Sequence, residues 1–257
     1  MAEAARLYRL SLALGARHLA RRGYLREAVV RLVIPMDPSR YVELPWAWRQ
    51  LDPRPGSTVL DLASPKLLAV ALARSGVHVT SVDALPREID AWRQLAEEQP
   101  NLRFEVADGR ALPYPDASFD HAYSISVLEH VEGDEQALRE LARVLRPGGR
   151  LVITLPHAPE AWDEYRTHAT YQEEAGKGGR YLFQRWYDTE RVDRLLAEAP
   201  ALEPVRREVV RLQPNLNALY TRMFPWLMPL GPLYGVLARE IRDTKGDVAR
   251  MLLRKRP

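Results

Sequence analysis

Residues 58–84, TVLDLASPKLLAVALARSGVHVTSVDA, are the segment of this chain with the clearest alternation of strand and helix patterns. Residues 58–63 are a short apolar run typical of a buried strand, and residues 78–84 are a second one. Between them, residues 65–76 begin with a proline and end with a glycine, as many helices do. Strand, helix and strand at this spacing predict a βαβ unit with two parallel strands.

The same alternation continues toward the carboxyl end of the chain. It predicts an α/β fold, a Rossmann-like, doubly wound and mostly parallel sheet of seven strands, with N-terminal helices and two insertions on the edge where ligands of such sheets bind. The further strands are expected at 102–109, 119–126, 150–156, 202–212 and 247–256, and the further helices at 87–99, 134–149 and 188–199.

Two parts of the chain depart from the alternation. Residues 1–50 are rich in arginine and leucine, and we expect a helical N-terminal extension there, followed by the main domain over residues 51–257. Within that domain, about 156–187 and about 213–245 interrupt the pattern and are expected to be insertions. Both follow strands expected to be parallel, so both should lie over the same edge of the sheet.

The composition excludes several kinds of chemistry. The chain has no cysteine, which rules out disulfides, thiolate metal sites and a cysteine nucleophile, and the six histidines show no ligand spacing, so we expect no metal. Arginines interrupt the first 22 residues, where a secretory signal would be apolar, so a cytoplasmic protein is expected.

The charge is unevenly distributed along the chain. Residues 1–50 carry nine arginines against four acids, residues 201–257 carry 11 Lys and Arg against five acids, and residues 51–200 are left with a net charge of −8. Basic ends could contact an anionic membrane or a polyanion, or could simply keep helices soluble. The run MFPWLMPLGPLYGVLA, residues 223–238, is too short and proline-rich to span a membrane; it could lie on one, hold a greasy substrate or pack as ordinary core.

Four motifs together carry a family resemblance. They are VLDLASPK at 59–66, SVDA at 81–84, VADGRALPYPDASFDHAYSISVLEHV at 106–131 and LRELARVLRPGGRLVITLP at 138–156. In combination they resemble the class I S-adenosylmethionine-dependent methyltransferases, in particular their small-molecule, type 11-like branch. The resemblance covers roughly residues 57–156. It implies a methyltransferase that uses S-adenosyl-L-methionine.

The resemblance also assigns a binding site. Asp83, at the end of the second strand, would accept hydrogen bonds from the ribose hydroxyls. Asp108, after the third strand, would accept them from the adenine amine, while Gly109 allows a close approach. The alternatives are a helix cap for Asp83 and an Asp-Gly turn for Asp108. The full set of expected cofactor-binding residues is Asp61, Ala63, Ser64, Lys66, Asp83, Ala84, Asp108, Gly109, Arg110, Ser126 and Arg40.

The turn after the first strand departs from the family pattern. Ala63, Pro65 and Leu67 stand where the family has three alternating glycines. Ser64 followed by Pro65 predicts a redesigned helix start, with serine as the N-cap, whose free N–H groups could meet the carboxylate of the cofactor. Lys66 could add a charge, although an exposed helix side chain is the simpler interpretation.

Few residues suggest the acceptor. His157, after the strand at 150–156, is the one candidate general base, with Tyr165 and His168 as weaker ones; His130 is expected to be structural. We expect methyl transfer to a small acceptor, with a lipophilic one as an option. Two alternatives stay open: an RNA methyltransferase using Trp46, Trp48 and Arg49, which the sequence disfavours, and a non-catalytic membrane or partner-binding scaffold.

Overall fold

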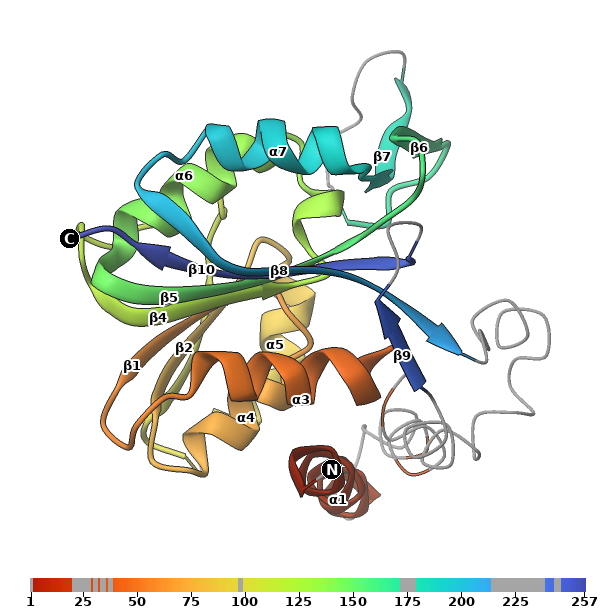
Figure 1. The fold of residues 1–257 in the computed structure, drawn as a ribbon. Helices are drawn as coiled ribbons and strands as arrows, with labels where there is room; N and C mark the ends of the chain where they lie inside the picture. Colours follow the sequence, from red (N-terminus) through yellow and green to blue (C-terminus); the bar gives the residue numbers. More distant parts are fainter. Residues whose placement is uncertain are drawn as a thin grey trace.

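A computed structural model describes residues 2–19, 29, 32, 36, 39–96, 99–171, 179–213, 239–242 and 246–257. Its centre is an eight-stranded sheet in the order β3-β2-β1-β4-β5-β10-β8-β9 (Figure 1). The strands are β1 (Thr58–Leu62), β2 (His78–Asp83), β3 (Leu102–Val106), β4 (Phe119–Ile125), β5 (Leu145–Pro156), β8 (Leu202–Gln213), β9 (Arg239–Arg242) and β10 (Val248–Lys255).

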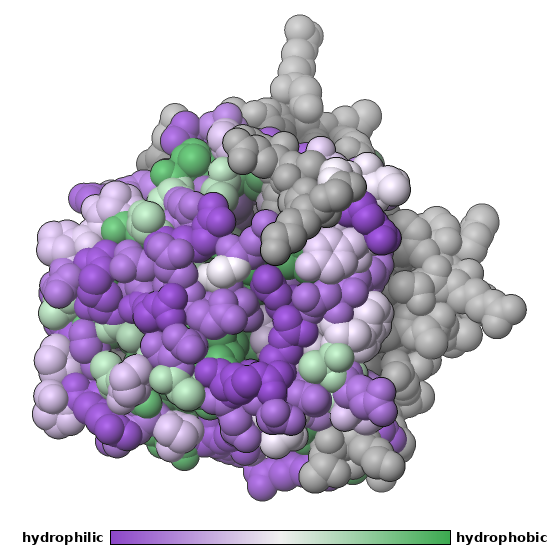
Figure 2. Space-filling model, turned by 90° about the horizontal axis from the view of Figure 1, so that it is seen from above, coloured by the Kyte–Doolittle hydropathy of each residue, from purple (hydrophilic) through white to green (hydrophobic). Residues whose placement is uncertain are grey.

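Helices cover both faces of this sheet, as predicted (Figure 1). On one face lie α1 (Ala2–Leu19), α3 (Arg40–Leu51), α4 (Leu67–Ala73) and α5 (Pro86–Ala96). On the other lie α6 (Asp134–Val144) and α7 (Thr189–Ala197), and their outer surface is mostly hydrophilic with scattered hydrophobic residues (Figure 2). A short 3₁₀ helix, η1 (Leu128–His130), follows β4.

The strand directions confirm the mostly parallel sheet. β1, β2, β3, β4 and β5 pair in parallel, while β10 is antiparallel to both β5 and β8, so β8 runs with the first five. β5 and β8 therefore end at the same edge of the sheet. The placement of the second insertion stays a prediction, because most of residues 213–245 lies outside the described residues. The first insertion carries a hairpin, β6 (Trp162–Arg166) and β7 (Tyr181–Trp186).

Two predictions of secondary structure were wrong. The main sheet has eight strands, not seven, because β9 adds to the edge of β8 by antiparallel pairing. The helix predicted over 134–149 ends at Val144, and Leu145–Gly149 belong to β5. Pro147 cannot continue a helix, and Gly148 has a φ of +79°, outside the helical region. The run at 223–238 lies outside the described residues.

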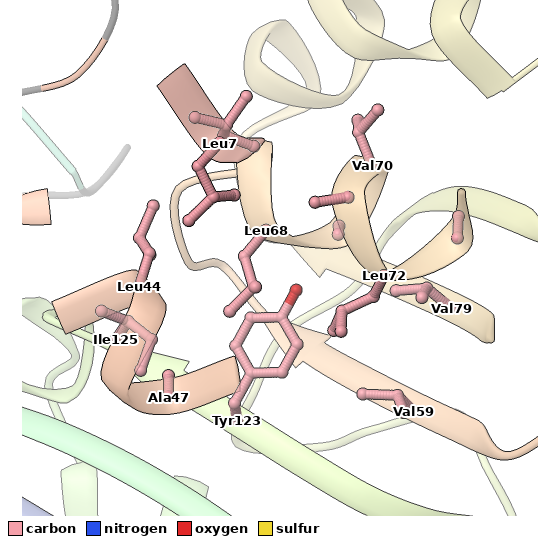
Figure 3. Close-up of a cluster of buried hydrophobic side chains, with 14 of the residues drawn as sticks. Leu7, Leu44, Ala47, Val59, Leu68, Val70, Leu72, Val79, Tyr123 and Ile125 are labelled. Carbon is pink, nitrogen blue, oxygen red and sulfur yellow. The ribbon is translucent and has the colours of Figure 1, made fainter. Parts of the chain in front are cut away.

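The N-terminal helices join the core of the sheet. Leu7, Leu10 and Leu14 recur on one side of α1 and are buried in the same cluster as α3, α4 and one sheet face. In the middle of that cluster, the ring of Tyr123 from β4 lies between α3 and α4 (Figure 3). The separation of residues 1–50 from the domain stays a prediction, but α1 and α3 contribute to a shared core.

We expect Leu7→Ala to lower the free energy of unfolding by about 2–5 kcal/mol, because Leu7 is fully buried and its truncation leaves a cavity. Chemical denaturation measures the change. Leu19→Ala is the matched control, since Leu19 is in the same helix and half exposed, and should change stability by less than about 0.5 kcal/mol. Equal effects of both variants would show that α1 does not dock as described.

Candidate functional site

The residues predicted to bind the cofactor meet at one edge of the sheet. β1, β2, β3 and β4 are neighbouring parallel strands, so the segments that follow them lie side by side. The segments are Ala63–Lys66 after β1, Ala84 after β2, Asp108–Arg110 after β3 and Ser126 after β4. Helix α3 adds Arg40, whose guanidinium donates to the Ser126 hydroxyl over 2.9 Å.

Asp61 is the innermost charged residue of this edge. Its side chain is fully buried; Oδ1 accepts the Ser64 N–H over 3.0 Å and Oδ2 accepts the Ser81 hydroxyl over 2.6 Å. Burial raises the pKa of Asp61, while the charge of Lys66 and these hydrogen bonds lower it in part. The carboxylate therefore acts first on the protein itself, by tying the turn after β1 to β2.

Ser64 does not cap the next helix, so that prediction was wrong. Helix α4 begins at Leu67, and its N-cap, Lys66, makes no capping hydrogen bond with its side chain. The Ser64 hydroxyl instead donates to the Leu62 carbonyl over 3.3 Å and accepts the Ile125 N–H over 2.9 Å. Ser64 thus connects the turn after β1 to the end of β4.

Lys66 is not the exposed helix side chain that the simpler interpretation predicted. Its side chain is only 4% exposed. Its ammonium lies 3.4 Å from Asp83 Oδ2 and 3.7 Å from Asp61 Oδ2, and donates to the Val82 carbonyl over 3.2 Å. The Lys66 ammonium therefore lies between two carboxylates of adjacent strands, Asp61 of β1 and Asp83 of β2.

Asp83 fixes the turn into the next helix, and its role in ribose binding stays a prediction. Oδ1 accepts the Leu85 N–H over 3.0 Å, which fixes the turn into α5, while Oδ2 faces Lys66. Its side chain is 12% exposed, against 0% for Asp61, so Asp83 is the carboxylate of this pair that a ligand can reach. Ala84, next in the chain, is exposed.

Asp108 is the most accessible acid of the edge, with 44% of its side chain exposed. Oδ1 accepts the Arg110 backbone N–H over 2.8 Å, as in an Asp-Gly turn, and the Arg110 guanidinium binds both carboxylate oxygens. These bonds hold the pKa of Asp108 below its ordinary value, despite partial burial. A Cβ at Gly109 would lie 2.8 Å from Leu62 Cδ1, so a larger residue would force the Leu62 side chain to shift.

Two residues of the edge adopt backbone conformations that disfavour a side chain. Ala63 and Ser126 both have a φ of +52°. Ala63 occupies a position where the family has glycine, and its N–H donates to the Val82 carbonyl over 2.8 Å. Residue 63 thus keeps a left-handed backbone conformation although it is an alanine and not a glycine, the residue that adopts this conformation without strain.

Sequence reasoning missed a buried polar cluster beside Ser126. Glu43 Oε1 accepts hydrogen bonds from the hydroxyls of Thr154, over 2.9 Å, and Ser126, over 3.0 Å, while Oε2 binds Arg40. Glu43 and Thr154 are buried, on α3 and β5. The one sequence feature that could have predicted this cluster is the presence of polar residues, Glu43 and Thr154, within otherwise apolar segments.

Glu129 is a second buried acid near this cluster. It is 3% exposed, and its Oε2 has no hydrogen-bond partner among the residues that the structure describes. Burial raises its pKa to about 8, although a backbone hydrogen bond and the charge of Arg40 lower it in part. Beside it, burial lowers the pKa of His130 to about 4, so the imidazole is neutral at pH 7.

The first insertion lies across the edge. The Thr170 carbonyl accepts a hydrogen bond from Arg87 of α5 over 2.8 Å, and the ring of Tyr171 lies 4.0 Å from that of His130. Phe183 of β7 continues this aromatic cluster, since its carbonyl binds His130 Nδ1 and its ring lies under Arg166. The insertion therefore reaches from β5 to the start of α5, over the ends of the strands between them.

The three candidate bases differ in their surroundings. His157 is buried, and its Nδ1 donates to the Gly246 carbonyl over 3.0 Å, which leaves Nε2 as an acceptor; that atom is buried with no partner among the described residues. Tyr165 and His168 are exposed on the insertion. A catalytic role for any of them stays a prediction. No group of three or more acids and histidines in the described part of the chain could hold a metal.

Comparison with known proteins supports the resemblance. Residues 60–153 match the family described as "Methyltransferase domain". An O-methyltransferase of Pyrenophora dematioidea is 34% identical over 130 residues, which are 46% of this chain and 49% of that protein. A demethylmenaquinone methyltransferase of Clavibacter sepedonicus is 39% identical over 107 residues, 41% of this chain and 43% of that protein. The chain thus spans less than half the length of the curated relatives it matches.

The solved structures support the fold. A Burkholderia thailandensis 1,6-didemethyltoxoflavin-N1-methyltransferase, with bound 1,6-didemethyltoxoflavin and S-adenosylhomocysteine, is 20% identical and superposes with a TM-score of 0.55. The match covers 86% of this chain and 80% of that one.

We expect Ala63→Gly to raise the free energy of unfolding by about 0.5–1 kcal/mol, because relief of the left-handed strain outweighs the added freedom of the unfolded chain. Ala137→Gly in the middle of α6 is the control, where a glycine should cost about 1 kcal/mol. Both are measured by denaturant unfolding. A loss of stability in both variants would contradict the strain at residue 63.

Glu129→Gln should stabilise the protein increasingly as the pH rises from 5 to 8. The pKa of Glu129 is raised in the folded state, so between about 4.5 and 8 the native state holds a proton that the unfolded state releases, and rising pH favours unfolding. Glutamine mimics the protonated acid and removes that dependence. Unfolding curves across this range, with the exposed Glu160→Gln as control, measure the difference; a constant difference between variant and wild type would contradict the assignment.

Proposed function

Because this chain carries a class I methyltransferase domain, we propose that the protein transfers a methyl group from S-adenosylmethionine to a small-molecule acceptor. The observation that carries the proposal is the pair of carboxylates at the ends of adjacent strands, Asp83 as the last residue of β2 and Asp108 just after β3. They offer acceptors for the hydroxyls and the amine of a nucleoside, and both are partly exposed.

The cofactor would supply an activated methyl group on a positively charged sulfur. The chain supplies binding and orientation. Asp83 would accept the ribose hydroxyls, and Asp108, oriented by Arg110, the adenine amine. Gly109 lets the backbone after β3 come close to Leu62, and Arg40, on the other side of the edge, supplies a cation for the carboxylate of the methionine part.

The acceptor would enter between the first insertion and the strand ends. Tyr171, His130 and Phe183 line this side with rings, which favours a flat and lipophilic acceptor. The names of the relatives agree with this direction, since they include an O-methyltransferase and a demethylmenaquinone methyltransferase. Glu129 is close to these rings, but its pKa of about 8 keeps it mostly protonated at neutral pH, so only its minor ionised form could take a proton from an acceptor hydroxyl.

The alternatives have less support. Trp46, which an RNA-binding surface would use for stacking, is 2% exposed and lies against Arg250. A non-catalytic scaffold would have no use for two partly exposed acids at the nucleoside position. Contact with an anionic membrane stays a prediction, because the run that suggested it lies outside the described residues. No described helix is long and apolar enough to cross a bilayer.

Asp83→Ala should weaken binding of S-adenosylhomocysteine at least ten-fold, because the variant loses the acceptor of the ribose hydroxyls. Isothermal titration calorimetry measures the dissociation constant. Asp90→Ala is the matched control, since Asp90 lies on α5 and its pairing with Arg93 is exposed. Absence of binding by the wild-type protein would remove the basis of the proposal.

The acceptor class is tested with methyl-labelled S-adenosylmethionine and a series of phenols and hydroquinones whose alkyl chains increase in length. We expect label in the organic extract, rising with chain length. Label that appears only with short, polar phenols would contradict a lipophilic acceptor.

A further inference from the structure

The turn after β1 places a protein cation in the nucleoside site. The Lys66 ammonium is 3.4 Å from Asp83 Oδ2, and its side chain is almost fully buried. The same amine donates to the Val82 carbonyl, the residue just before Asp83. Lys66 therefore contacts the carboxylate that the proposed function assigns to the ribose.

The two acids beside Lys66 are not equivalent. Asp61 is inaccessible and already accepts the Ser64 N–H and the Ser81 hydroxyl. Asp83 is partly exposed, and beside Lys66 it accepts the Leu85 N–H. A ligand arriving at this edge can therefore compete with Lys66 for Asp83 and cannot compete for Asp61.

We propose that Lys66 is an internal competitor of the cofactor, which must leave Asp83 before that carboxylate can accept the ribose hydroxyls. The inference rests on the proposed function. Lys66 has a second partner at hand, because Asp61 Oδ2 is only 3.7 Å from the same amine. A small movement toward Asp61 frees Asp83 and keeps the ammonium paired in the interior, where an unpaired charge would be costly.

This arrangement makes Lys66 a residue that sets cofactor affinity. The competing ion pair is shielded from solvent, so its loss on binding subtracts from the affinity that the hydrogen bonds to Asp83 provide. The competition weakens binding without abolishing it, because Lys66 retains its ion pair with Asp61. At Asp83, the ion pair with Lys66 is replaced by hydrogen bonds from the ribose hydroxyls. Removal of the amine should therefore tighten binding.

The experiment compares Lys66→Met with the wild type by isothermal titration calorimetry, using S-adenosylhomocysteine and S-adenosylmethionine as probes. We expect the dissociation constants to fall at least five-fold. Lys255→Met is the matched control, because Lys255 also donates to backbone carbonyls, those of Arg143 and Leu145, but at the opposite edge of the sheet. It should leave the dissociation constants unchanged.

The outcomes separate this inference from the proposed function. Equal or weaker binding by Lys66→Met would overturn the inference, and weaker binding would make Lys66 a direct ligand of the cofactor. Binding by neither protein would overturn the proposed function, and the inference with it.

A second measurement needs no variant, in case Lys66→Met does not fold. A crystal structure of the wild-type protein with S-adenosylhomocysteine should show the Lys66 amine moved away from Asp83 and toward Asp61. An amine still 3.4 Å from Asp83, with the ribose hydroxyls bound elsewhere, would overturn the inference.

Discussion

The buried carboxylate of Asp61 is the constraint on which the edge of this sheet depends. A carboxyl group without solvent needs partners for its oxygens, and Asp61 finds them in the Ser64 N–H, the Ser81 hydroxyl and the nearby Lys66 ammonium. These partners come from the turn after β1 and from β2. Since Ser64 also accepts the Ile125 N–H, one acid fixes how the ends of three neighbouring strands lie together.

The strained residues belong to the same arrangement. Ala63 and Ser126 follow neighbouring strands, β1 and β4, and both hold a left-handed backbone that costs about 1–2 kcal/mol each. The hydrogen bonds of Ala63 to Val82 and of Ser126 to Thr154 and Glu43 hold them there. Strain of this kind persists only where the surrounding structure over-determines it, and here it lies where a ligand of the sheet would bind.

The hydrophobic pattern of the sequence was sufficient for the order of the elements, because buried strands and amphipathic helices each leave a period in the chain. It could not predict β9, which consists of four mostly charged residues whose pairing depends on the neighbouring β8. The resemblance placed Asp83 and Asp108 at strand ends, where the structure has them, although their role in binding is untested.

The contacts of the site were harder to foresee. Glu43 and Thr154 are 111 positions apart, so no local spacing connects them. Lys66 was expected in solvent because a lysine in the first turn of a helix normally is. The carboxylates of Asp61 and Asp83, with 0% and 12% of their side chains exposed, hold it in the interior instead. Tertiary electrostatics, which leave no period in a sequence, decided these positions.

The short β9 also bears on how copies of this chain meet one another. The outermost strand of an open sheet presents unpaired N–H and C=O groups that another chain can pair with, which is a common route to aggregation. Among the described residues, the outermost strand is four residues long, reads Arg-Glu-Ile-Arg, and pairs with the last four residues of β8, a strand of 12 residues. A strand so short and so charged is a poor template for pairing, so the described part of the sheet ends on that side in a strand that discourages self-association.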